Sequence, residues 1–163
     1  MSKVITDAAQ ALVGVEQASV TIEVDKSATR KFATAIAFPD QPNPLYYDEE
    51  AAKRGPHGGL IAPPTFCTSF PWLAGLLEKI NPTMGKYRVG LNGGNEYELY
   101  TPVRPGDVVT AKPKLVSLHE KPRDDGGVML VMVLQADFFN QRQEHALTTR
   151  WTLLRIYGPE NLQ

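Results

Sequence analysis

Large apolar residues in the middle of the chain recur with helical spacing. Five of them are separated by four, three, four and three residues: Phe66, Phe70, Leu73, Leu77 and Ile80. This spacing predicts a helix that is buried along one whole face. Pro63 and Pro64 suit its start, because the first N–H groups of a helix have no partner within it. Pro71 must kink or divide the helix, and Asn81-Pro82 ends it.

The pattern before this helix predicts one strand and two further helices. Residues 20–24 alternate and are rich in β-branched side chains, as in a short strand. Asp25 is a good helix cap, and apolar residues follow it with helical spacing: Ala28, Phe32, Ala35 and Ile36. They form one apolar stripe on a helix of about three turns. Asp48 caps a shorter helix through residues 49–53, and residues 55–59 form a flexible turn.

The second half of the chain has the patterning of strands. Four segments predict them: residues 96–103, 107–119, 128–140 and 146–157. Turns rich in glycine, proline and charge separate the segments. The segment from residue 128 to 139 is apolar on almost both faces, as in a central strand that is covered on two sides. This order of elements predicts an α+β fold in which an antiparallel sheet wraps around the central helix.

The second face of this sheet needs a cover as well. If the central helix covers one apolar face, a domain of this size has no further layer for the other. We therefore infer that the sheet of a partner subunit covers it.

Composition and charge narrow the classes of function. The chain has 163 residues, 17 basic and 18 acidic, with a formal net charge of -1. Bulk charge therefore recruits neither nucleic acid nor an anionic membrane. The apolar stretches are too short to span a bilayer, and the N-terminus has no signal-peptide pattern. The lone cysteine, Cys67, cannot form an internal disulfide, so we expect a cytoplasmic protein with Cys67 as a small core residue.

Three segments carry a resemblance to a known family: "AFPDQPNPLYYDEEAA", residues 37–52; "GGLIAPPTF", residues 58–66; and "GLNGGNEYELYTPVRPGD", residues 90–107. In this order they resemble the overhang loop, the entry to the central helix, and a strand and turn of the MaoC-like hydratase/dehydratase family, in its N-terminal-half, FAS1-like dehydratase type. The resemblance implies a hot-dog fold that pairs with a second hot-dog. It also implies one domain over residues 1–163, with a core from about 20 to 157.

The resemblance implies a carbon–oxygen lyase of acyl-thioester metabolism. Such an enzyme adds water to a 2-enoyl thioester, or removes it from a 3-hydroxyacyl thioester, of coenzyme A or acyl carrier protein. It uses no metal or redox cofactor. A carboxylate and an imidazole must hold water and move protons, a backbone N–H must stabilise the enolate oxygen, and a dry tunnel must hold the acyl chain. The three histidines lack metal-ligand spacing, and no Walker A or GxGxxG motif is present.

Two catalytic features of the family are altered in this sequence. Asp40 stands near the family's aspartate, with one extra residue before Asn43, and Tyr46 stands where the family has its histidine. The ordinary pKa of tyrosine is about 10, so Tyr46 is a poor base at neutral pH, although it can donate a hydrogen bond. In the family, a glycine supplies the backbone N–H that forms the oxyanion hole. This glycine aligns with Pro64, which has no backbone N–H. Thr65 is the next donor along the chain.

His57 is a third catalytic candidate, because the turn that carries it precedes the central helix and can reach a pocket mouth. The catalytic candidates are Asp40, Tyr46 and His57. The substrate-binding candidates are Asn43, Gly58, Gly59, Ala62, Pro64, Thr65 and Phe66. Structural alternatives exist for each catalytic candidate: a turn carboxylate for Asp40, packing for Tyr46 and a solvated loop for His57.

These features predict the acyl-thioester-binding subunit of a hydratase or dehydratase, with the catalytic Asp and His supplied by a second MaoC-like chain. One alternative is a self-sufficient homodimer that uses Asp40 with Tyr46 or His57. Another is a non-enzymatic protein that binds acyl-coenzyme A. A thioesterase is possible on this fold, but no Asp or Glu stands at the start of the central helix.

Overall fold

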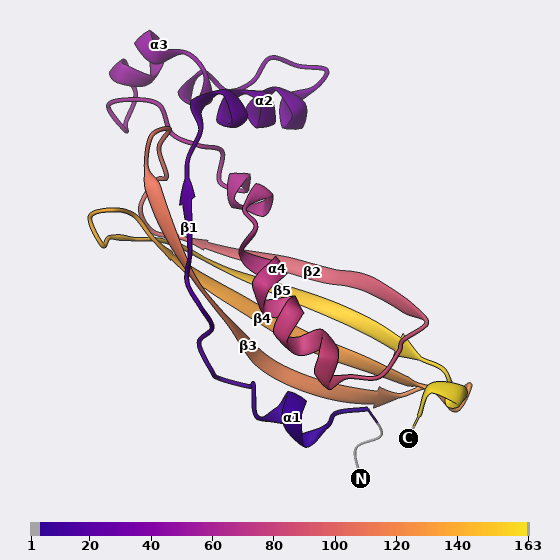
Figure 1. Ribbon diagram of the computed structural model, residues 1–163. Coiled ribbons are helices and arrows are strands. Elements are labelled where there is room, and N and C mark those ends of the chain that lie inside the picture. The colour runs from indigo at the N-terminus through magenta and orange to yellow at the C-terminus, as the bar shows by residue number, and fades with distance from the viewer. Residues whose placement is uncertain (1–3, 163) are drawn as a thin grey trace.

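The computed structural model describes residues 4–162. One antiparallel sheet of five strands, in the order β1-β3-β4-β5-β2, forms its centre. The strands are β1 (Val20–Glu23), β2 (Val89–Leu99), β3 (Val108–Pro122), β4 (Val128–Phe139) and β5 (His145–Tyr157). The sheet bends around the helix α4 (Trp72–Ile80), while α2 (Lys26–Ala37) and α3 (Glu49–Arg54) gather at one end of the molecule (Figure 1). This is the α+β hot-dog arrangement that the sequence predicts.

Short helical segments complete the described chain. They are α1 (Asp7–Gln10) and the 3-10 turns η1 (Pro44–Tyr46), η2 (Phe66–Ser69), η3 (Asn81–Thr83) and η4 (Pro159–Asn161). In residues 4–162 no helix has the length and apolar character needed to cross a membrane.

The central helix is divided as Pro71 predicts. The chain forms η2, becomes extended at Phe70, and starts α4 directly after Pro71. This break shifts the helical phase, so the buried positions of α4 are Trp72, Leu76 and Ile80. Leu73 and Leu77, which the spacing places in the buried stripe, are only partly buried. The helix is therefore predicted correctly, but its buried face is correct only in part.

The core lies between α4 and the inner face of the sheet. Alternate residues of β4 point into it and are fully buried, among them Leu130, Met132 and Leu134. A ladder of aromatic rings extends this core toward α2. Its centroid distances are 5.8 Å from Phe138 to Phe70, and 5.4 Å for both Phe70–Phe66 and Phe66–Phe32. Because rings at these distances exclude water, the ladder joins the sheet, the central segment and α2 into one apolar unit.

The two predicted helix caps are confirmed. The Asp25 carboxylate accepts a hydrogen bond from Ala28 N at 2.6 Å at the start of α2. At α3 the Asp48 carboxylate accepts from Glu50 N and Ala51 N, each at 3.0 Å. Both caps satisfy N–H groups that lack a partner inside the helix.

The helix α2 forms where the sequence predicts it, but its apolar stripe is mostly exposed. Thr29 and Ala33 are the buried residues and Phe32 is half-buried, whereas the other predicted positions are exposed: Ala28, Ala35 and Ile36. The Thr29 hydroxyl donates to Asp25 O at 2.8 Å, and the Phe32 ring contacts Phe66. The side of α2 that packs against the rest of the chain therefore lies next to the apolar stripe, and the stripe itself remains on the surface.

The start of β2 is also corrected, because the strand begins at Val89 and not at residue 96. Glycines hide the beginning from a pattern search, since glycine normally weakens a strand. Here the pairing with β5 shifts between Asn92 and Gly94, and a Cβ at Gly93 would lie 3.1 Å from both Leu154 Cγ and Thr152 Cγ2. A bulge and a close approach to β5 therefore require glycine. The strand ends at Leu99, so residues 100–103 leave the sheet.

The other predicted strands lie where the sequence expects them. The largest difference is the end of β3, which lies at Pro122 and not at residue 119.

The outer face of the sheet carries apolar side chains of β4 and β5 that remain partly exposed, among them Met129, Val131, Leu154 and Ile156. A partner on this face stays a prediction.

Candidate active site

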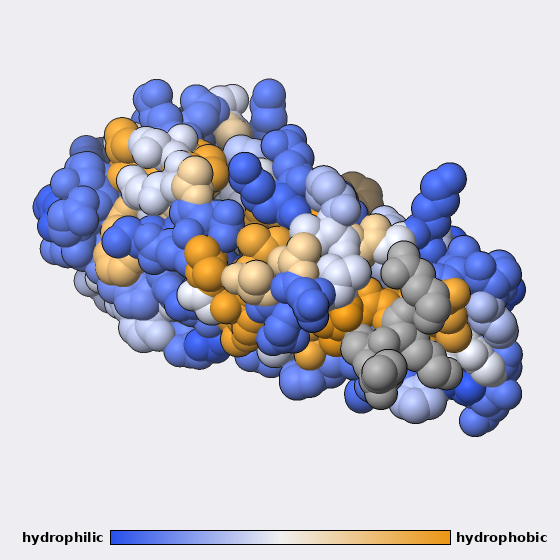
Figure 2. Space-filling model, turned by 60° about the horizontal axis from the view of Figure 1, so that its bottom comes forward, coloured by the Kyte–Doolittle hydropathy of each residue, from blue (hydrophilic) through white to orange (hydrophobic). Residues whose placement is uncertain are grey.

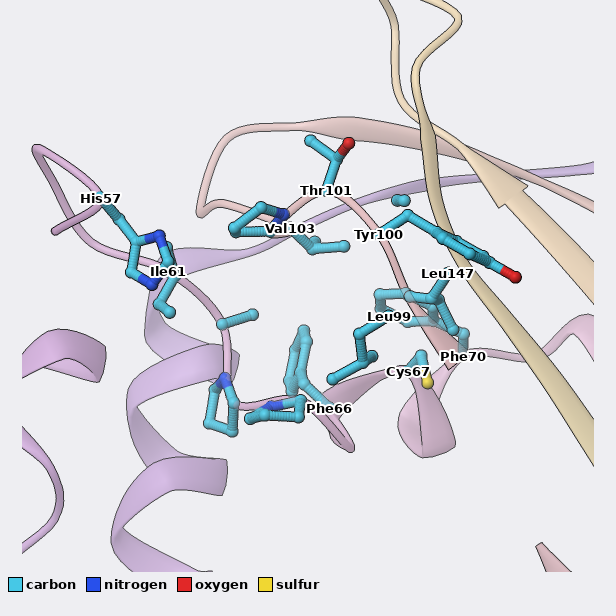
Figure 3. Close-up of a pocket in the computed structure, with 15 residues that line it drawn as sticks. His57, Ile61, Phe66, Cys67, Phe70, Leu99, Tyr100, Thr101, Val103 and Leu147 are labelled. Carbon is cyan, nitrogen blue, oxygen red and sulfur yellow. The ribbon is translucent and has the colours of Figure 1, made fainter. Parts of the chain in front are cut away.

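An apolar pocket of about 260 Å³ lies between the entry to the central helix and the segment that follows β2. Its lining residues come from three parts of the chain: His57, Ile61, Ala62, Pro63, Pro64, Phe66, Cys67 and Phe70; Leu99, Tyr100, Thr101, Pro102 and Val103; and Ala146 and Leu147. Figure 3 shows His57 and Ile61 at one end and Cys67 and Phe70 at the other. The apolar lining suits a short acyl chain.

Backbone hydrogen bonds hold the two main walls together. Ala62 N donates to Val103 O at 2.7 Å, which ties the entry segment to the chain leaving β2. Ile61 N donates to Leu45 O at 3.1 Å, which ties the same segment to η1. Pro63 and Pro64 then keep the wall from continuing as a strand or beginning a helix too early. The proline-rich sequence therefore forms the pocket by keeping the entry segment irregular.

His57 is the one imidazole among the residues that line the pocket, and histidine is the side chain that most often transfers protons in enzymes. Its backbone carbonyl accepts a hydrogen bond from Arg104 Nη2 at 2.7 Å, which fixes the loop that carries the ring. Within residues 4–162 the imidazole itself has no hydrogen-bond partner. It is half-buried at the mouth of the pocket.

The other polar side chains in the pocket wall are poor acids and bases at pH 7. Burial raises the pKa of the Cys67 thiol to about 12, so it stays protonated. The Tyr100 hydroxyl donates to Glu98 Oε2 at 2.7 Å, and this bond raises its pKa above the ordinary value. None of the residues that line the pocket is an Asp or Glu. The pocket thus offers one imidazole and no carboxylate.

The structure does not bring the three catalytic candidates together. Asp40 is exposed in the turn after α2, where its backbone N–H donates to Ala37 O at 2.8 Å. Tyr46 is half-buried in η1. Neither residue lines the pocket, whereas His57 does.

The substrate-binding candidates divide into three groups. Ala62, Pro64 and Phe66 line the pocket. Gly58 and Gly59 line a neighbouring polar groove.

Asn43 and Thr65 form the third group, outside both hollows. The Asn43 side chain accepts from Leu45 N at 3.0 Å and thereby caps η1. Thr65 is exposed beside the pocket, and its N–H has no hydrogen-bond partner within the described chain. It is therefore a free backbone donor next to Pro64, which has none.

Sequence reasoning missed the second wall of the pocket, from Leu99 to Val103. It treated residues 96–103 as continuous strand, although Pro102 and Pro105 give a signal that the strand stops. It missed the floor at Ala146 and Leu147 as well, because nothing in a strand pattern indicates which positions face a cavity. In residues 4–162 no group of three His, Cys, Asp or Glu side chains is placed to hold a metal ion.

Comparison with known proteins identifies the family. A model described as the FAS1-like dehydratase domain region matches residues 11–149. A UPF0336 protein of Parafrankia sp. (strain EAN1pec) is 35% identical over 108 residues, which are 65% of this chain and 69% of that protein.

Solved structures of hot-dog dehydratases have the same fold. The MaoC-like dehydratase of Rhodospirillum rubrum is 25% identical with a TM-score of 0.60, covering 90% of this chain and 94% of that one. The HadBC complex of Mycobacterium tuberculosis, a 3R-hydroxyacyl-ACP dehydratase, is 21% identical with a TM-score of 0.70, covering 92% and 98%. The family match over residues 11–149 shows that this chain belongs to the FAS1-like dehydratase domain family, and the likeness to the Rhodospirillum rubrum protein places it within the MaoC-like hot-dog hydratases and dehydratases.

Proposed function

We propose that this chain is the acyl-thioester-binding subunit of an enoyl-thioester hydratase or 3-hydroxyacyl dehydratase, and that a second MaoC-like hot-dog chain supplies the catalytic Asp and His. The observation that carries this proposal is the composition of the pocket. It is an apolar cavity with one imidazole at its mouth and no carboxylate in its wall. Hydration of an enoyl thioester needs a carboxylate as well as a base to orient and deprotonate water.

The proposed roles of the two chains follow from the reaction. The pocket holds the acyl chain, with the thioester near His57. In the hydration direction the partner's base takes a proton from water while the water oxygen bonds to C3 of the enoyl group. C2 then receives a proton. The negative charge that develops on the thioester oxygen needs a backbone donor. The free N–H of Thr65 lies beside Pro64 and is the candidate for that role.

The free edge of the sheet is the proposed docking element for the partner. Among the described residues β2 pairs with β5 alone, so its other edge is open, and every β2 residue except Tyr97 is exposed. Large apolar side chains are exposed along it and just beyond it, among them Val89, Leu91, Leu99 and Tyr100. Open apolar edges of this length favour pairing with another strand. Since Leu99 and Tyr100 also line the pocket, a partner at this edge would lie beside it.

Two further observations support a partner on this chain. Figure 2 shows a broad apolar area on one face of the molecule, with hydrophilic residues toward the ends. The HadBC structure, which contains a chain with this fold, is that of a complex.

The experiment is an assay of hydration with crotonyl and longer enoyl thioesters, using this chain assembled with a coexpressed MaoC-like partner. Asp40→Asn in this chain should leave kcat within about twofold, because Asp40 lies outside the pocket. Substitution of the partner's catalytic His by Asn should lower kcat by about 100-fold or more, the usual scale for a general base. If Asp40→Asn removes turnover while the partner's substitution does not, the chain is a self-sufficient enzyme and the proposal is wrong.

A further inference from the structure

The second wall of the apolar pocket, residues 99–103, leaves the sheet at the end of β2. Tyr100 N and Thr101 N both donate to Ala146 O, at 2.9 and 3.1 Å. Within the described part of the chain, Tyr100 is the one member of this wall whose side chain makes a hydrogen bond. The position of the wall therefore depends on the contacts that hold Tyr100.

The hydroxyl of Tyr100 is bound outside the pocket. Figure 3 shows that it points away from the pocket, and it donates to Glu98 Oε2 at 2.7 Å. The other carboxylate oxygen of Glu98 accepts from Arg150 Nη1. The bonds from Arg150 and Tyr100 lower the pKa of the Glu98 carboxyl. Glu98 is therefore an ionised acceptor for the Tyr100 hydroxyl at neutral pH.

A closed chain of contacts on the outer face of the sheet leads from Glu98 back to Tyr100. We call it the anchor network, and its members are Glu98, Tyr100, Gln135, Asp137, His145, Thr148 and Arg150. From Arg150 the chain continues to β4, where Arg150 Nε donates to Gln135 Oε1 at 2.9 Å. Gln135 Nε2 then donates to Asp137 Oδ1 at 3.0 Å. The network thus joins β2 to β5 and β4.

His145 closes the network onto Tyr100. The centroids of these two rings are 4.3 Å apart, and the Phe139 ring stacks on the same imidazole at 4.9 Å. Although burial raises the pKa of Asp137, the donors around it lower the pKa below its ordinary value. Its carboxylate therefore only accepts at neutral pH, and it takes the hydroxyl proton of Thr148 at 2.7 Å. His145 Nε2, 3.1 Å from Thr148 Oγ1, must then be the donor, and this bond fixes the imidazole.

We propose that His145 is a positioning residue of the acyl pocket, which stacks on Tyr100 and thereby keeps residues 99–103 in place as the second wall. This inference rests on the proposed function, because it takes the acyl chain to occupy the apolar pocket. His145 itself does not line the pocket. A binding site needs side chains that are fixed by packing and by hydrogen bonds behind them, and the anchor network supplies both. Losing the stack lowers the fraction of chains with the wall in place, and the apparent affinity falls with it.

Calorimetric titration of the full chain with hexanoyl-pantetheine tests the proposal. The His145 side chain is 35% exposed, so His145→Leu should stay folded, which thermal unfolding checks. The loss of the stacked ring should weaken binding by about threefold to tenfold, the scale of one aromatic pair. His145→Phe keeps an aromatic ring without the bond to Thr148 and should restore most of the affinity. His119→Leu, at an exposed position of β3 outside the network, is the matched control and should bind as the wild-type chain does.

A double-mutant cycle shows whether His145 acts through Tyr100. Tyr100→Leu should weaken binding as well. Adding His145→Leu to it should cause no further loss, because the ring on which His145 acts is already absent. Amide hydrogen exchange gives a readout without ligand, since His145→Leu should speed exchange at the Tyr100 and Thr101 N–H groups.

The outcomes separate this inference from the proposed function. Three results would each overturn the inference and leave acyl binding intact: unchanged affinity in His145→Leu, an equal loss in His145→Phe, or losses that add up in the cycle. Unchanged amide exchange in His145→Leu would overturn it as well. Failure of the wild-type chain to bind hexanoyl-pantetheine would overturn both the inference and the proposed function.

Discussion

Tyr46 and Pro64 stand where the family resemblance places a histidine and a glycine. Tyr46 lies in η1 outside the pocket, and Pro64 lines the pocket without an N–H to offer. The residues that remain are well suited to binding. Ala62 and Phe66 form an apolar wall, and His57 lies at its mouth. At the scale of single residues, the proposed function takes this chain to have kept a place for an acyl group and not a complete acid/base pair.

The pocket assignment predicts the effect of filling it. Ala62 is buried in the pocket wall, so Ala62→Phe should lower the affinity for a hexanoyl thioester by at least about tenfold, because the ring takes the space of the acyl chain. Overpacking should also cost about 1–3 kcal/mol of unfolding free energy. Calorimetric titration and urea unfolding measure the two effects. Ala35→Phe, at an exposed position of α2, is the control, and loss of binding in both variants alike would speak against this pocket.

Cys67 provides a test by pH and chemical reactivity. Burial raises the pKa of its thiol from 9.0 to about 12. At pH 8 the thiolate fraction should therefore be about a thousandfold lower in the folded chain than in the unfolded one, with iodoacetamide labelling slowed accordingly. Mass spectrometry of labelled folded and guanidinium-unfolded protein follows this rate. Rapid labelling of the folded chain would show that Cys67 is not held as described.

The same shift makes a signed prediction for stability. Because burial raises the pKa of the Cys67 thiol in the folded chain, the protonated thiol contributes fully to the free energy of unfolding below pH 9. This contribution is lost as the pH rises from about 9 toward 12. Removing the thiol in Cys67→Ala should make the unfolding free energy less dependent on pH in that window.

At the scale of elements, patterns that repeat were predictable and irregular segments were not. The apolar spacing of residues 66–80 predicts the central helix, and Pro71 predicts its division. The caps Asp25 and Asp48 follow from local chemistry alone. The start of β2 cannot be predicted from local chemistry. Its glycines are required by a bulge and by a close contact with β5, and both exist only after the sheet has formed.

The pocket shows the same limit. Its first wall, residues 61–66, carries the sequence motif, and Ala62, Pro64 and Phe66 were identified from it. Its second wall, residues 99–103, lies opposite only because β2 and β5 pair in one register. A contact between segments about forty residues apart has no local signal in the sequence.

A polar network on the outer face of the sheet links β3, β4 and β5. Asp137 accepts from Thr148 Oγ1 at 2.7 Å and from Gln135 Nε2 at 3.0 Å, and Lys114 Nζ lies 3.4 Å away. Burial alone would raise the pKa of Asp137, but these donors outweigh it, so the pKa lies below 3.8. The network therefore stabilises the ionised form and joins three strands.

Asp137→Asn should destabilise the chain by about 1–2 kcal/mol at pH 7, the scale of hydrogen bonds to a charged group. Since the folded-state pKa is depressed, this contribution is present above pH 3.8 and disappears as the pH falls through the lower folded-state value. Urea unfolding at a series of pH values from 7 downward through 3.8 measures the change. Asp124→Asn, in an exposed turn, should have little effect at any of these pH values, and an Asp137→Asn effect that does not shrink as the pH falls below 3.8 would contradict the electrostatic explanation.

At the scale of the whole molecule, the open edge of β2 and the pocket beside it belong together. Leu99 and Tyr100 are exposed and line the pocket at the same time. A partner strand at this edge would cover them and bring its own residues next to the mouth. Assembly and catalysis should therefore depend on the same surface.

Leu91→Lys should prevent this assembly, because an exposed charge on an edge strand opposes pairing with another strand. Leu91 is 50% exposed, so the melting temperature of the isolated chain should change little. Light scattering coupled to size exclusion gives the mass of the mixture with the partner. Val116→Lys, at an exposed position of β3, should leave assembly intact. Equal loss of assembly in both variants would place the interface elsewhere.

Steady-state turnover of an enoyl thioester by this chain alone, and then during titration with the MaoC-like partner, tests the central claim most directly. The account predicts no turnover above the uncatalysed rate for the chain alone. It predicts activity that rises with added partner and levels off at one partner per chain. Full turnover by the isolated chain, unchanged when the partner is added, would contradict it.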